Sequence, residues 1–140
     1  MDKKLKIALA QLNPLVGDVS GNIKKLISIR SKLDEDIDIL VAPELYVSGY
    51  PIDDLVLRED FLNLVKEEIN KLVKSTEDNK SAIIVGAPRK DNESIKNSVF
   101  VIENGKIISG LNAFLNKLDI IAYSAFLIAI NKPLERKKIG

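Results

Sequence analysis

Short apolar runs alternate with stretches of helical periodicity along most of the chain. An apolar, β-branched run of roughly 4–8 residues between turn residues is typical of a buried strand. Apolar positions that recur every three or four residues are typical of an amphipathic helix. These patterns predict five strands and two helices in the order β-α-β-α-β-β-β. The predicted strands cover residues 5–12, 37–42, 82–85, 97–103 and 106–109.

The two predicted helices differ in how clearly the sequence marks them. Asn22 is placed to cap the first helix, because asparagine is a favoured N-cap residue. Its predicted apolar face comprises Ile23, Leu26, Ile27 and Leu33. The second helix runs from about residue 59 to 73 and carries charge opposite a strongly apolar face. That face comprises Phe61, Leu62, Val65, Ile69, Leu72 and Val73.

Strands that alternate with helices predict an α/β fold with at least one parallel pair of strands. Asn104 and Gly105, between the last two strands, are the preferred pair for a two-residue hairpin turn. The last strand therefore returns antiparallel, and the predicted sheet is mixed. After Ser109 the pattern is lost, because residues 111–130 are an apolar mixture without strand alternation or clear helix caps.

Composition and charge exclude several classes of partner. Hydrophobic residues make up 46% of the chain and charged residues 29%, which is typical of a globular domain. A formal net charge of +1 gives no electrostatic reason to expect nucleic acid or a membrane surface as a partner. The longest late apolar stretch, residues 120–131, is shorter than the roughly 20 residues of a membrane span. With no signal-peptide pattern at the start, a cytoplasmic location is expected.

The chain contains neither cysteine nor histidine. The missing cysteine excludes disulfides, zinc–thiolate sites and a thiol nucleophile. The missing histidine excludes Ser-His-Asp catalysis and the commonest transition-metal ligand. Any chemistry of the chain must therefore use carboxylates, lysines, hydroxyl groups or the backbone.

Glu44 is the strongest candidate for a chemical role. It follows the apolar strand predicted at residues 37–42, and sites in open α/β sheets gather at the carboxyl ends of strands. Pro43 restricts the backbone before it, and apolar Leu45 and Tyr46 follow. A carboxylate in this setting would be partly desolvated, which suits a general base. A solvated loop glutamate is the alternative interpretation.

Other polar residues have simpler interpretations. The acidic residues between 34 and 38 lack the spacing of a metal-binding loop and predict a solvated turn. Ser48 has neither a nucleophile elbow nor a histidine to activate it. Tyr46 and Tyr50 are expected to pack, and Lys106 to be an exposed turn residue.

Several short motifs together resemble the nitrilase, or carbon–nitrogen hydrolase, superfamily. In particular, they are similar to the amino-terminal glutaminase domain of glutamine-dependent NAD synthetases. The opening at residues 6–14 is followed by a Val-Gly-Asp segment and a Gly-Asn pair. The other matching segments are Pro43-Glu44-Leu45, Gly49-Tyr50-Pro51, Asp54-Leu55, Val85-Gly86-Ala87-Pro88 and Asn97-Ser98-Val99. The resemblance covers about residues 4–108.

The resemblance implies part of an α-β-β-α sandwich and a Glu-Lys-Cys triad. In that triad the glutamate is the general base, the cysteine attacks an amide carbon and the lysine stabilises the oxyanion. Only Glu44 carries over; Lys117 lies near the expected lysine position without a matching context, and the cysteine is absent. The resemblance implies no cofactor and no metal. It implies glutamine as the amide substrate and association into homo-oligomers or with a partner chain.

The loss of pattern divides the chain into a truncated hydrolase part, residues 1–108, and a divergent tail, residues 109–140. A frameshift is the hypothesis for this division, which the other reading frames of the coding DNA would test. The expected function is a truncated, inactive amidase of glutaminase type whose ancestral role was to release ammonia for NAD synthesis. The alternative is a non-catalytic fragment that pairs with a separately encoded remainder of the hydrolase.

Overall fold

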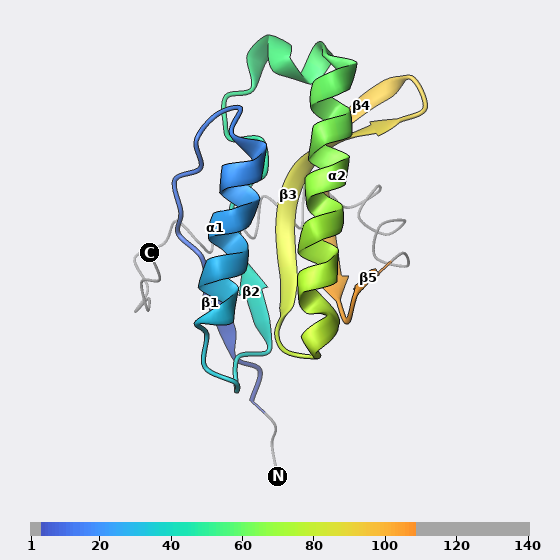
Figure 1. Cartoon of the computed structure of the whole chain (residues 1–140). Coiled ribbons are helices and arrows are strands. Elements are labelled where there is room, and N and C mark those ends of the chain that lie inside the picture. Colours follow the sequence, from blue (N-terminus) through green and yellow to red (C-terminus); the bar gives the residue numbers. More distant parts are fainter. Residues whose placement is uncertain (1–3, 109–140) are drawn as a thin grey trace.

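The computed structural model describes residues 4–108 of the 140-residue chain. The strands and helices follow the predicted order, with two additional 3₁₀ helices, η1 and η2 (Figure 1). The elements are β1 (Ile7–Leu9), α1 (Val19–Ser31), β2 (Ile39–Val41), η1 (Asp53–Leu57), α2 (Glu59–Ser75), η2 (Thr76–Asp78), β3 (Ala82–Asp91), β4 (Ser94–Glu103) and β5 (Lys106–Ile107).

The five strands form one mixed sheet in the order β1-β2-β3-β4-β5. The first three strands are parallel, and β3, β4 and β5 are antiparallel. Asn104 and Gly105 both have positive φ, 51° and 73°, as the predicted hairpin turn between β4 and β5 requires. The predicted α/β class and mixed sheet are confirmed.

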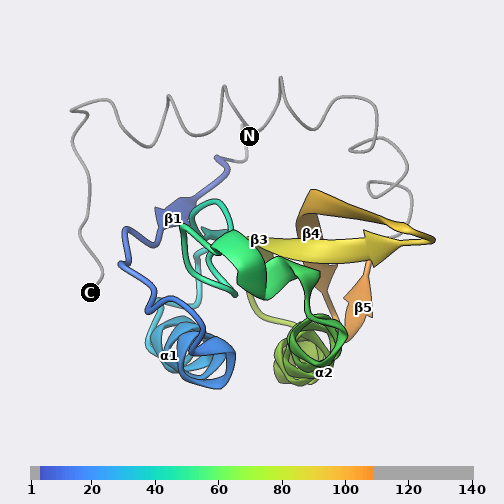
Figure 2. The same ribbon diagram turned by 90° about the horizontal axis from the view of Figure 1, so that it is seen from above.

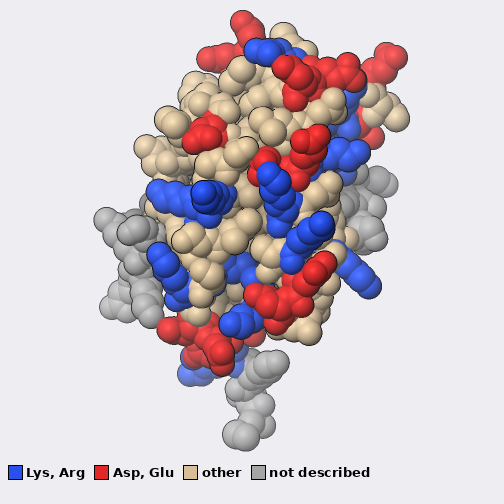
Figure 3. All heavy atoms as spheres, in the orientation of Figure 1, with Lys and Arg blue, Asp and Glu red and all other residues tan. Residues whose placement is uncertain are grey.

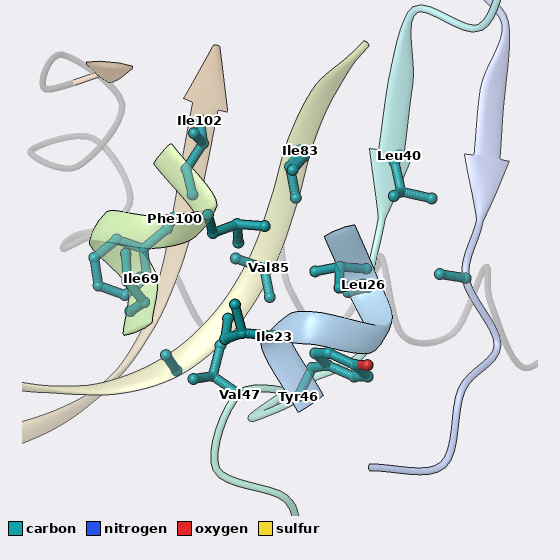
Figure 4. Packing of buried hydrophobic residues seen from close by; sticks show 14 of the residues in the cluster. Ile23, Leu26, Leu40, Tyr46, Val47, Ile69, Ile83, Val85, Phe100 and Ile102 are labelled. Carbon is teal, nitrogen blue, oxygen red and sulfur yellow. The ribbon is translucent and has the colours of Figure 1, made fainter. Parts of the chain in front are cut away.

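Both helices pack against the same face of the sheet (Figure 2). The core lies between this face and the apolar stripes of α1 and α2, and Tyr46 and Val47 pack beside Ile23 and Leu26 (Figure 4). The predicted apolar face of α2 is confirmed, with Val73 half-buried and its other members buried. Strand residues in this core include Ala8, Leu40, Ile83, Val85, Phe100 and Ile102.

The opposite face of the sheet is also apolar. It is here called the helix-free face, because no helix of residues 4–108 packs against it. Successive strand residues point to opposite faces, so the neighbours of the core residues lie on this side. Ile7 is 46% exposed and four other members are partly buried, whereas Val41 and Val99 are buried. The strand residues assigned to it are Ile7, Leu9, Ile39, Val41, Ile84, Val99 and Val101.

Strand β3 is longer than the sequence predicts. It continues through Gly86, Ala87 and Pro88 to Asp91, although a Gly-Ala-Pro segment is expected to end a strand. The pairing with β2 ends at Ile84, so the proline lies where one edge of β3 has no neighbouring strand. Proline is tolerated at such an edge because no ladder hydrogen bond is lost. Strands β1 and β2, in contrast, are shorter than predicted.

The first helix begins earlier than predicted, because its N-cap is Asp18 rather than Asn22. A carboxylate oxygen of Asp18 accepts the backbone N–H of Gly21 at 3.1 Å. This contact satisfies one of the donors that a helix start leaves free. Asn22 therefore lies within α1, where it is buried.

The Asn22 side chain links two loops that are far apart in the sequence. Its Oδ1 accepts the N–H of Leu15 at 3.0 Å, and its Nδ2 donates to the Leu15 carbonyl at 2.9 Å. The same Nδ2 donates to the carbonyl of Val47 at 3.1 Å. The loop after β1 and the loop after β2 are thereby both held against α1.

A buried arginine joins α1 to the segment between α2 and β3. The guanidinium of Arg30 donates two hydrogen bonds to the carboxylate of Asp78, at 2.8 and 2.9 Å. It also donates to the carbonyls of Ser75 and Ser81. The hydrogen bond from Arg30 lowers the pKa of Asp78 to about 2.

Charge is dispersed over the side of the molecule that carries the helices. Figure 3 shows acidic and basic side chains interspersed there, without a large field of one sign. Within residues 4–108, no helix is both long and apolar enough to cross a membrane.

Replacing Asn22 by alanine should lower the free energy of unfolding by about 2–4 kcal/mol, because buried backbone groups of both loops lose their partners. Urea unfolding at neutral pH would measure this loss. Asn70→Ala is the matched control, since Asn70 is an exposed asparagine in helix α2. Equal losses for the two variants would contradict the role assigned to Asn22.

Asp78→Asn should lower the free energy of unfolding by roughly 1 kcal/mol at pH 7, a figure reduced for solvent screening of a half-exposed carboxylate. The folded-state pKa of Asp78 is about 2, below its ordinary value of 3.8, so the unfolded chain binds the proton first as the pH falls. The difference between wild type and variant should therefore shrink below about pH 5 and vanish near pH 1, below both pKa values. Urea unfolding across this range, with Asp54→Asn as control, checks the dependence; a pH-independent difference would contradict it.

Candidate active site

The Glu44 carboxylate lies in a tight turn just beyond the carboxyl end of β2. The N–H of Tyr46 donates to the carbonyl of Pro43 at 3.3 Å, which closes the turn around Glu44 and Leu45. Leu45 has a φ of +49°, unusual for a residue with a branched side chain, and its side chain is buried. Glu44 itself is half-buried. The turn thus anchors Leu45 in the protein while Glu44 keeps access to solvent.

The partner of Glu44 is Asn97 of strand β4. The Asn97 Nδ2 donates to the Glu44 Oε1 at 2.5 Å, across 53 positions of the sequence. Asn97 is three positions before the core residue Phe100 in β4, so the two side chains point to opposite faces of the sheet. Asn97 therefore shares a face with Val99 and Val101. The Glu44–Asn97 contact therefore lies on the helix-free face of the sheet.

The segment after Glu44 is fixed by hydrogen bonds to three other parts of the fold. The Val47 N–H donates to the carbonyl of Gly86 in β3 at 3.2 Å. The Tyr46 hydroxyl donates to the backbone carbonyl of Asn22 at 2.8 Å, and burial raises the pKa of this hydroxyl to about 12. The Ser48 carbonyl accepts the N–H of Gly17 at 2.9 Å.

A close approach of the two loops explains the glycine at position 49. Its φ is +78°, and a Cβ atom there would lie 2.6 Å from the Cα of Val16. A side chain would force the loops apart, and the positive φ also favours glycine. The Gly-Tyr-Pro segment seen in the sequence therefore serves the packing of these loops.

The other polar residues considered in the sequence have structural roles or surface positions. Ser48 is buried, and its hydroxyl donates to backbone carbonyls of its own turn. Tyr46 packs in the core as predicted, but Tyr50 is 72% exposed, so the expectation that it packs was wrong. Lys106 is exposed, as expected. Lys117 lies outside the described residues.

The acidic residues between 34 and 38 serve a turn. The carboxylate of Asp38 accepts the backbone N–H of Lys6 at 2.9 Å, and the Lys6 ammonium pairs with Asp36. This cluster connects the start of β1 to the segment before β2 and agrees with the predicted turn. Within residues 4–108, no group of three or more acidic side chains is arranged to hold a metal ion.

The arrangement at Glu44 gives the chain a proton acceptor with one oriented oxygen. A neutral amide donor such as Asn97 fixes the carboxylate and leaves its charge in place. A salt bridge to lysine or arginine would neutralise that charge. The sequence analysis proposed Glu44 as a candidate but did not predict its contact with Asn97. The available signal was the Asn-Ser-Val motif, although the motif alone did not say which group Asn97 contacts.

The sequence profile of the carbon–nitrogen hydrolase family matches residues 6–129. This chain belongs to the carbon–nitrogen hydrolase family. The match extends past residue 108, where the resemblance was expected to end. The division of the chain into residues 1–108 and 109–140, with its frameshift hypothesis, stays a prediction.

Relatives of this chain include much longer proteins. It is 37% identical over 125 residues to a glutamine-dependent NAD(+) synthetase of Thermotoga maritima, covering 89% of this chain and 21% of the relative. A relative of the same name from Aquifex aeolicus is 34% identical over 104 residues, with 74% and 18% covered. This chain thus spans about a fifth of the length of these curated relatives.

Solved structures agree with the fold. The glutamine-dependent NAD+ synthetase of Acinetobacter baumannii has a TM-score of 0.63 at 29% identity, covering 76% of this chain and 20% of that one. An amidase from Nesterenkonia sp. has a TM-score of 0.61 at 16% identity, with 74% and 40% covered. This chain therefore has the strand and helix arrangement of part of the nitrilase-type fold, as its sequence predicts.

Removing the Glu44 carboxylate should release the Asn97 side chain. In a Glu44→Ala variant, the two Asn97 side-chain amide protons should move upfield, because the charge-assisted hydrogen bond is lost. Two-dimensional NMR of the amide groups measures this change. Glu103→Ala, at an exposed glutamate of the same strand, is the control. Unchanged Asn97 resonances in Glu44→Ala would mean that the two side chains do not interact in solution.

Proposed function

We propose that this chain supplies the general-base part of a glutaminase-type active site. The observation that carries the proposal is the Glu44 carboxylate, held after β2 and oriented by Asn97, in a chain of the carbon–nitrogen hydrolase family. The proposed reaction is hydrolysis of the side-chain amide of glutamine. The relatives named glutamine-dependent NAD(+) synthetases support this substrate and a use of the released ammonia in NAD synthesis.

In the proposed mechanism, Glu44 accepts the thiol proton of a cysteine that another segment supplies. The sulfur attacks the amide carbon, and the nitrogen takes up the proton held by Glu44 and leaves as ammonia. Water then cleaves the resulting thioester, which releases glutamate and restores the thiol. In the Nesterenkonia amidase, acrylamide adds to an active-site cysteine, whereas the present sequence contains no cysteine. The 140-residue chain by itself should therefore not hydrolyse glutamine. Members of a catalytic triad act as a unit, so a base without its nucleophile retains little catalysis.

The helix-free face favours a second candidate function, that of an interaction module. Its apolar row, including the 46% exposed Ile7, is typical of a surface that another layer covers. In this alternative, the chain pairs with a separately encoded remainder of the hydrolase and contributes no catalysis. Glu44 would then be a surface glutamate at the edge of the interface.

Grafting residues 6–108 into the Thermotoga maritima synthetase, in place of its similar segment, would separate the two candidates. The graft should release ammonia from glutamine, and Glu44→Gln in the graft should reduce the rate at least about a thousandfold. Glu103→Gln is the control, and circular dichroism confirms folding. A Glu44→Gln graft with nearly full activity would exclude the general-base role and leave the interaction module.

The isolated chain gives the complementary measurement. Its ammonia release from glutamine should equal that of its own Glu44→Gln variant, because the nucleophile is missing. Release above that variant would contradict the proposed inactivity. Co-purification of a second chain that carries a lysine and a cysteine would support the interaction module, and a monomer alone would count against it.

A further inference from the structure

A groove separates α2 from the hairpin of β3 and β4. Its volume is about 500 Å³, within the roughly 300–1,000 Å³ of small-molecule sites. The helix contributes lining residues from Glu59 to Asn70, spaced by three or four positions, so one stripe of α2 faces the groove. At about 1.5 Å per residue this stripe is roughly 16 Å long. The groove can therefore hold a ligand longer than a single ion.

The bottom of the groove is apolar. Leu62 and Ile69 of α2 and Phe100 of β4 line it, and each is less than 10% exposed. Figure 4 shows Ile69 beside Phe100 between the helix and the sheet. An apolar group of a ligand would gain free energy by moving from water onto this apolar surface, which is already packed and rigid.

The rim of the groove carries more positive than negative charge. Lys66 of α2 and both Arg89 and Lys90 of β3 line it, against a single acidic residue, Glu59. The Lys90 Nζ lies 3.7 Å from a carboxylate oxygen of Glu59, so this ion pair joins β3 to the start of α2. Arg89 is half-buried, which reduces the screening of its charge by water. The rim thus attracts an anion.

We propose that this groove binds a small organic carboxylate with an apolar body. The body lies on Leu62, Ile69 and Phe100, and the carboxylate meets the cationic rim at Lys66 and Arg89. The residues that line the groove include neither Glu44 nor Asn97. The groove is therefore a second site, and it does not depend on the proposed amide hydrolysis.

Titration of the 140-residue chain with three probes tests the two parts of the site separately. 4-Phenylbutyrate supplies both body and charge, 4-phenylbutanamide supplies the body alone, and acetate supplies the charge alone. In two-dimensional NMR, 4-phenylbutyrate should shift the amide resonances of Leu62, Phe100 and Ile107 in a saturable way. It should bind about five times more tightly than the amide, the gain typical of one screened ion pair. Acetate should not saturate the site.

Charge variants test the rim in both directions. Lys66→Glu should weaken binding of 4-phenylbutyrate by at least about fivefold, and Glu59→Gln should strengthen it by about twofold. Lys24→Glu on the exposed face of α1 is the control and should leave the affinity unchanged. Dispersed amide resonances show that each variant folds. Equal affinity for acid and amide, perturbations that map to another part of the chain, or equal effects of the two lysine reversals would overturn the proposal.

Discussion

The carboxamide of Asn22 is the contact on which the geometry of the candidate site depends. It satisfies backbone groups of Leu15 and Val47, which lie in two loops that lack regular structure of their own. Buried backbone groups need partners, and a loop has no ladder to supply them. Because Val47 comes three residues after Glu44, the same carboxamide limits how far the Glu44 turn can move. A helix residue thus positions a carboxylate that it never touches.

The core and the candidate site lie on opposite faces of the sheet. The face toward the helices carries the core that stabilises the fold, with α1 and α2 covering Leu40, Ile83 and Val85. The helix-free face carries an apolar row and, at one end, the contact between Glu44 and Asn97. The segment after Glu44 is therefore held by hydrogen bonds to α1 and β3, while the Glu44 side chain contacts Asn97 on the helix-free face. Within residues 4–108, the turn and the Asn97 side chain together orient this carboxylate.

The sequence predicts the parts of this fold that depend on local patterns. The stripe of α2, the turn at Asn104 and the alternation of strands and helices follow from periodicity and turn chemistry, and all agree with the structure. The predicted start of α1 was wrong because asparagine and aspartate are both good N-caps. Only the geometry shows which of the two side chains reaches a free N–H. The continuation of β3 through Pro88 was missed because it depends on where the neighbouring strand ends.

Long-range contacts explain why the candidate site was only half predictable. Glu44 could be found because its neighbours in the sequence define a strand end, which is a local signal. Asn97 could not be paired with it, because the contact depends on the register of β4 against β3 and on the face to which Asn97 points. A shift of that register by one residue would turn Asn97 toward the helices and Ser98 toward Glu44. The turn of the β3–β4 hairpin sets this register and therefore determines which donor the carboxylate meets, although the turn itself lies outside the site.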